Sequence, residues 1–163
     1  MEGTQSMKEL YHFTSYQHML EIIVAGKIIR TESNLLYPVN MRKVNGRIIS
    51  DADGYKPVVW LTDSILPGRL GLDIPGVSPE YAKDRIRLTI DPALIDAVKW
   101  TVWADQNNMD AAWRAQLTRG QNFRSWYITE KEIPIAAVTH IYDRFKRIEI
   151  IGYQGQESGE NNS

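Results

Sequence analysis

The order of apolar and polar positions predicts a strand at Glu9–Phe13 and a helix directly after it. Apolar side chains recur at helical spacing at Tyr16, Met19, Leu20 and Ile23. We expect Thr14 to cap the first turn, with Gln17 completing a capping box. Gly26 suits the left-handed backbone position that ends a helix. A short strand at Lys27–Arg30 is expected next, which gives a strand–helix–strand opening.

The rest of the chain predicts further short strands and one further clear helix. Turn signals such as Pro38, Asn45–Gly46 and Asp51–Gly54 make residues 31–56 a long irregular excursion with one hairpin. Strands are expected at Arg47–Ser50, Pro57–Thr62, Asp84–Asp91, Phe123–Thr129, Val138–Tyr142 and Arg147–Ile151. A helical turn or two is expected in Pro92–Val98, and a helix at Asn108–Leu117 that Gly120 ends. Asp84–Asp91 alternates polar and apolar residues, as in a strand with one solvated face.

These elements add up to one α+β domain, which we place at residues 7–151. A chain of 163 residues is long enough for a single buried core. The polar segments 1–6 and 152–163 are expected to be flexible tails, because they lack the apolar residues that order requires. We find no internal repeat and no linker that divides the chain.

The composition excludes several classes of function but indicates none directly. The net charge of −1 gives no global attraction for nucleic acid or anionic membrane. There are no cysteines, so disulfides, zinc–thiolate sites and cysteine nucleophiles are excluded. No long apolar run or leader-like N-terminus occurs, and a soluble cytoplasmic protein is the simplest expectation.

Motifs exclude several other chemistries. The sequence has no glycine-rich phosphate loop and no G-x-S-x-G serine elbow. The three histidines are not spaced as metal ligands, so no metal site is expected. Asp51–Gly54 resembles part of a calcium loop, but Trp60 stands where the bidentate glutamate belongs. We interpret that segment as a turn.

His12 is the strongest polar candidate for a binding site. It stands at the end of a short apolar strand, beside the hydroxyls of Thr14 and Ser15. Two interpretations stay open for the imidazole, namely a bond to a backbone carbonyl or a bond to a sugar hydroxyl of a ligand. The two hydroxyls either cap the helix or face the same ligand.

Three patches of the chain resemble ADP-ribosyltransferase-like proteins, in particular the bacterial toxin branch that modifies DNA. The patches are LYHFTSYQHMLEIIVAGKI, VVWLT and RSWYITEKEIPIAAVTHI. The resemblance implies a split antiparallel or mixed sheet with few helices, and NAD as substrate. It implies that His12 contacts the NAD ribose and that Trp60 stacks on nicotinamide, with Thr62 beyond it on the same strand face.

The resemblance breaks down at the catalytic acid. By analogy a glutamate is expected before the run Trp126–Ile128, at about Ser125, where no acid occurs. Glu130 and Glu132 follow soon after, and a shifted register or bulge would bring one of them into the cleft. The alternative is that both are solvated carboxylates in the turn before Pro134.

The chemistry explains which residues such a site needs. Breaking the nicotinamide–ribose bond develops positive charge on the ribose, which an oriented carboxylate stabilises. Basic side chains hold the pyrophosphate by charge-assisted hydrogen bonds. Arginines near the loops that would flank the cleft are Arg30, Arg42, Arg47 and Arg69, each of which is otherwise a surface charge.

Three functions therefore stay open. The first is an NAD-dependent mono-ADP-ribosyltransferase that modifies a protein or nucleic acid, in a toxin, defence or counter-defence role. The second is a non-catalytic module that binds NAD or a related nucleotide, which the missing acid at Ser125 favours. The third is a nucleic-acid-binding protein, based on Arg85 and Arg87 on one strand face. A second set of arginines and aromatics also supports it: Arg114, Arg119, Arg124, Trp113, Phe123 and Trp126. The RNA 2′-phosphotransferase branch ranks lower, because its histidine and arginine set is not recognisable here.

Overall fold

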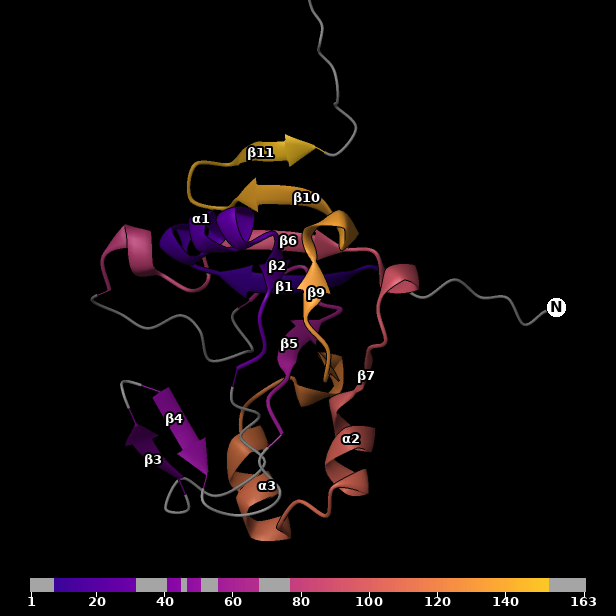
Figure 1. Cartoon of the computed structure of the whole chain (residues 1–163). Coiled ribbons are helices and arrows are strands. Elements are labelled where there is room, and N and C mark those ends of the chain that lie inside the picture. The colour runs from indigo at the N-terminus through magenta and orange to yellow at the C-terminus, as the bar shows by residue number, and fades with distance from the viewer. Residues whose placement is uncertain (1–7, 32–40, 45–46, 51–55, 68–76, 153–163) are drawn as a thin grey trace, which may run out of the picture.

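A seven-stranded antiparallel sheet, in the order β11-β10-β6-β1-β5-β8-β7, organises the computed structural model (Figure 1). The structure describes residues 8–31, 41–44, 47–50, 56–67 and 77–152, with the side chains of 41–50 left out. The strands of the sheet are β1 Leu10–Thr14, β5 Val59–Thr62, β6 Ile86–Ile90, β7 Val98–Lys99, β8 Trp126–Thr129, β10 Val138–Asp143 and β11 Ile148–Gly152. Two small antiparallel pairs are β2 Lys27–Ile28 with β9 Ile133–Pro134, and β3 Met41–Val44 with β4 Arg47–Ser50.

Three α-helices accompany the sheet within the described residues, so the expected α+β class is confirmed. They are α1 Tyr16–Ala25, α2 Trp100–Gln106 and α3 Ala111–Thr118. Single 3₁₀ turns occur at η3 Pro79–Tyr81, η4 Pro92–Leu94, η5 Phe123–Ser125 and η6 Ile135–Ala137. The predicted tails lie outside the described residues, apart from Gly152 at the end of β11.

The predicted opening is confirmed, with a correction at the helix cap. Ser15, not Thr14, is the N-cap of α1, because its Oγ accepts a hydrogen bond of 3.0 Å from the amide of His18. Thr14 instead ends β1. Gly26 ends the helix at φ 76°, and its amide donates to the carbonyl of Ile22. A residue with a Cβ adopts this left-handed conformation only at a cost, which explains the glycine.

Most other predicted elements occur within a residue or two of their expected bounds. β5, β6, β10 and β11 match expected strands, and β4 matches the expected hairpin arm. β8 begins three residues later than expected, because Phe123–Ser125 forms η5, and the expected helical turn in Pro92–Val98 is the shorter η4. The expected strand at Lys27–Arg30 is shorter, at Lys27–Ile28. The second predicted helix begins later, because Asp110 accepts from the amide of Trp113 and caps α3.

The sheet separates two apolar cores, one on each face. Val59 and Leu61 of β5 join the first core, beneath α1, together with Leu88 of β6. The neighbouring residues Val58 and Trp60 pack with the second core, beneath α2 and α3. Successive side chains of a strand point to opposite faces, so β5 contributes to both cores. Figure 1 accordingly shows α1 beside β6 and β10, and α2 and α3 near the β7 end of the sheet.

The pairing of strands is shortest between β1 and β5, near the middle of the sheet. These strands share a single paired position, Tyr11 with Thr62, whereas β1 and β6 pair along five positions from Leu10 to Thr14. In Figure 1 β5 is steeply inclined to β1. Where a ladder ends so early, the strands diverge and leave room for side chains or a ligand between them.

Candidate functional site

A cleft of about 770 Å³ lies where β1 and β5 diverge, and we call it the β1–β5 cleft. One side is formed by β1 and the start of α1, from Tyr11 to Glu21. The other is formed by Trp60 and Leu61 of β5 with Trp126 of β8. Tyr81, the last residue of η3, and Lys83, just after it, also line the cleft. Segments far apart in the sequence therefore meet at this one place.

His12 lines the cleft and also bridges the two diverging strands. Its Nδ1 lies 2.8 Å from the backbone oxygen of Trp60. A carbonyl only accepts, so Nδ1 carries the proton in this bond and Nε2 is left as an acceptor. Burial lowers the pKa of His12 from 6.5 to about 4, so the ring is neutral at physiological pH. The bond to a backbone carbonyl is one of the two roles considered for this histidine. It also fixes the orientation of the ring, which a bond to a sugar hydroxyl of a ligand would need.

Trp60 stands at the border between the cleft and the second core. Its ring packs edge-on against Trp126, with the centroids 5.8 Å apart, and lies 6.4 Å from the ring of Trp100. The side chain is only partly buried and lines the cleft. Aromatic packing holds the indole in place, and a rigid aromatic wall is one that a planar ligand ring can pack against.

The two predicted threonines differ in position. Thr14 lines the cleft, next to Ser15. Thr62 is fully buried and is not among the described residues that line it. Its hydroxyl donates to Ser125 Oγ at 3.1 Å and accepts from the amide of Ser64 at 3.0 Å. The hydroxyl of Thr62 therefore joins β5 to η5 within the protein.

The two predicted catalytic glutamates lie outside the described lining of the cleft. Glu130 accepts a hydrogen bond of 2.7 Å from the indole nitrogen of Trp103. Glu132 forms an ion pair with Lys27, at 3.0 Å between Oε1 and Nζ. Ser125, where the analogy expects an acid, is buried and donates to the carbonyl of Asn122. No shift of register brings either carboxylate to His12, because β8 pairs regularly with β5 from Trp126 to Thr129.

Of the four arginines predicted to hold the pyrophosphate, Arg30 is the one whose side chain the structure describes. Arg30 is exposed and donates to the backbone oxygen of Glu130, away from the cleft lining. Arg69 and the side chains of Arg42 and Arg47 lie outside the described residues. The described cation that does line the cleft is Lys83, which the sequence analysis did not single out.

His18 and Glu21, which the sequence analysis also did not single out, lie on the cleft side of α1. Their side chains are 3.1 Å apart, from Nδ1 to Oε1, and both line the cleft. Glu21 is the acidic residue among the described lining residues. A sequence signal existed, because residues three apart on a helix share a face, and Ser15 at the cleft begins that helix.

The arginines that suggested nucleic-acid binding are mostly engaged within the protein. Arg85 is buried and bonded to Asp143, and Arg114 pairs with Asp105. Arg87 lies over the ring of Tyr142, 4.8 Å from its centroid. The guanidinium of Arg124 lies over Phe123. Four of the five arginines therefore have a partner within the protein.

The described residues contain no group of three His, Asp or Glu side chains that is arranged to hold a metal ion. None of their helices is both long and apolar enough to cross a bilayer. Comparison with known proteins found no matching family model, curated protein or solved structure.

Proposed function

We propose that the β1–β5 cleft binds NAD or a closely related nucleotide. The observation that carries the proposal is the convergence of His12 and Trp60, 48 positions apart, at one cleft. The neutral imidazole offers Nε2 to a ribose hydroxyl, and the indole offers a wall for a planar ring. A volume of about 770 Å³ falls within the usual range of small-molecule sites.

The chemistry of the lining supports binding rather than turnover as the leading function. Glu130 and Glu132, the acids proposed to stabilise positive charge on the ribose, are engaged by Trp103 and Lys27. A module that sequesters or senses an NAD-derived nucleotide needs the cleft but not that acid. We therefore favour a binding module of the ADP-ribosyltransferase-like kind.

Calorimetric titration of the full chain with NAD tests this proposal. Wild type is expected to bind, and His12→Ala to bind at least about tenfold more weakly, because a buried polar contact to the ligand is lost. The melting temperature should change by only a few degrees. His140→Ala is the matched control, because His140 is exposed on β10. This variant should bind NAD as tightly as wild type. Absence of wild-type binding contradicts the proposal.

An NAD-dependent mono-ADP-ribosyltransferase, acting on a nucleic acid or protein, is the second candidate. The observation that favours it is Glu21, a carboxylate that lines the same cleft as His12. An anion there would stabilise the ribose cation as the bond to nicotinamide breaks.

Nicotinamide release separates the two candidates. The transferase predicts free nicotinamide from NAD, lost in Glu21→Gln and retained in Glu130→Gln and Glu132→Gln. Binding without release supports the module. Loss of release in Glu130→Gln or Glu132→Gln, with Glu21→Gln active, would assign the chemistry to the acids first suggested by the sequence.

A further inference from the structure

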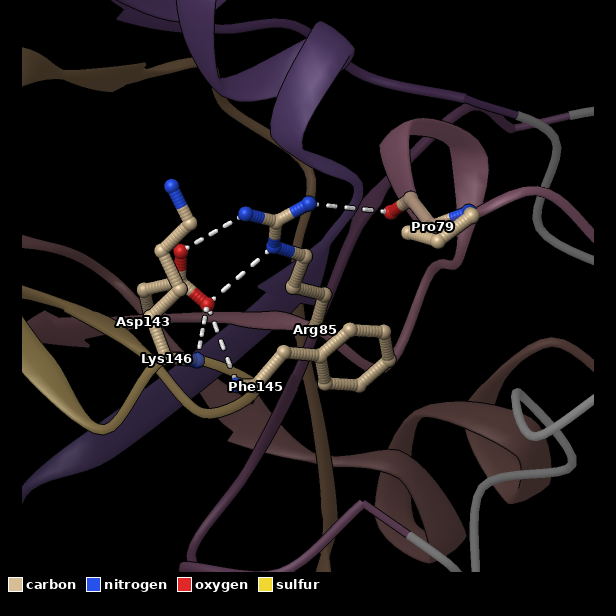
Figure 2. A network of polar contacts seen from close by, with 5 residues as sticks. All are labelled: Pro79, Arg85, Asp143, Phe145 and Lys146. Atoms are coloured by element: carbon tan, nitrogen blue, oxygen red, sulfur yellow. Dashed lines mark hydrogen bonds and ion pairs between the residues drawn. The ribbon is translucent and has the colours of Figure 1, made fainter.

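A buried ion pair fixes the segment that carries Lys83 to the cleft. Arg85 is 7% exposed, and its Nε and Nη2 donate to the two carboxylate oxygens of Asp143 at 3.1 and 2.9 Å. Its Nη1 donates to the backbone oxygen of Pro79 at 3.3 Å (Figure 2). One side chain thus ties the end of β10 to the start of η3.

Further contacts hold this arrangement from both sides. Asp143 also accepts from the amides of Phe145 and Lys146, as Figure 2 shows. The guanidinium of Arg85 lies 4.7 Å from the ring centroid of Tyr16, the first residue of α1. Because all three guanidinium nitrogens donate and the ring of Tyr16 covers the group, Arg85 has little freedom to move.

Tyr81 and Lys83 lie between the two anchored positions, Pro79 and Arg85. The amide of Tyr81 donates to Ser78, and the amide of Arg85 donates to Ala82, so the short segment is held along its length. Tyr81 and Lys83 both line the cleft, whereas Ala82 between them is not among the described lining residues. Within the described part of the chain, Lys83 forms no ion pair with a carboxylate.

From this geometry we propose that Lys83 binds a phosphate of the nucleotide in the β1–β5 cleft, and that Arg85 with Asp143 positions it. This inference rests on the proposed function. It assigns the phosphate contact to a lysine between β5 and β6 rather than to the arginines that the sequence suggested. A primary ammonium held at a cleft offers a phosphate a charge-assisted hydrogen bond. The site then selects phosphorylated nucleotides over nucleosides.

The test measures NAD affinity by calorimetry at low and high salt, in four forms of the full chain. Lys83→Ala is expected to bind about tenfold more weakly than wild type at low salt, as loss of one charged hydrogen bond predicts. Its affinity should also depend less on salt, because one ionic contact is missing. Lys83→Arg should retain most of the affinity. Lys146→Ala, an exposed lysine in the β10–β11 turn, is the control and should match wild type.

The outcomes separate this inference from the proposed function. If wild type does not bind NAD, the proposed function fails and this inference fails with it. If wild type binds NAD but Lys83→Ala binds equally well, with the same salt dependence, the nucleotide site stands and Lys83 is not its phosphate contact. A loss in Lys83→Ala with unchanged salt dependence also contradicts a phosphate contact.

Discussion

At the scale of single residues, two histidines at the same cleft have different environments. His12 is held by the carbonyl of Trp60 and is kept neutral by burial, which lowers its pKa to about 4. His18, on the cleft side of α1, has a side chain that is 36% exposed and has Glu21 as its partner. The buried ring therefore suits a fixed, neutral contact with a ligand.

Acidification is expected to destabilise the fold through His12. The unfolded chain takes up a proton near pH 6.5, whereas the folded ring does so only near pH 4. Between these values the unfolded state binds more protons, so stability falls as the pH falls, by at most about 3 kcal/mol. Urea unfolding of wild type and His12→Gln across this range measures it. Equal slopes for the two proteins would show that His12 does not carry the effect.

At the scale of elements, the Arg85–Asp143 pair joins η3, β6 and β10. Asp143→Asn removes the negative charge but keeps the shape, and leaves a buried guanidinium without its counter-ion. Breaking a buried pair in this way costs roughly 3–5 kcal/mol. Urea unfolding measures the loss, and amide hydrogen exchange of residues 80–83 should speed up because their anchor weakens.

The exposed Asp96–Lys131 ion pair provides the control for this prediction. Both side chains are about three-quarters exposed, at 74% and 75%. Asp96→Asn should leave the unfolding free energy unchanged within error, because solvent screens exposed pairs. An equal loss in the two variants would indicate that burial of Arg85 has no special importance.

The elements that the sequence predicted well are those with a local physical signal. Gly26 marked the end of α1 because the position requires a left-handed backbone, and that requirement depends on no distant contact. Thr14 and Ser15 are both good caps, so the sequence did not distinguish between them. Helix α2 was missed, and its N-cap, Lys99, forms no side-chain cap bond. Its tryptophans favour a helix only through packing in the second core.

At the scale of the whole molecule, the cleft depends on contacts that no local pattern specifies. The segment with His12 was recognisable by itself, but its distance to Trp60 depends on how β1 and β5 pair. Lys83 lies at the cleft in a short segment that the bond between Arg85 and Asp143 anchors, and these two residues are 58 positions apart. The positions of Glu130 and Glu132 could not be predicted for the same reason, since the pairing of β8 with β5 decides where the turn after Thr129 points.

Trp60 contributes both to stability and to the proposed binding site, because it packs with the second core and lines the cleft. Trp60→Ala is expected to cost about 3–5 kcal/mol of stability and to weaken NAD binding, since it removes core contacts and the aromatic wall together. Trp60→Phe keeps an aromatic ring and should retain most of both. Trp113→Phe is the control: Trp113 packs against the same core but is not among the described cleft residues. Urea unfolding and NAD calorimetry on the three variants measure both effects. Stability loss without any change in affinity for Trp60→Ala would remove Trp60 from the binding site and leave it as a core residue alone.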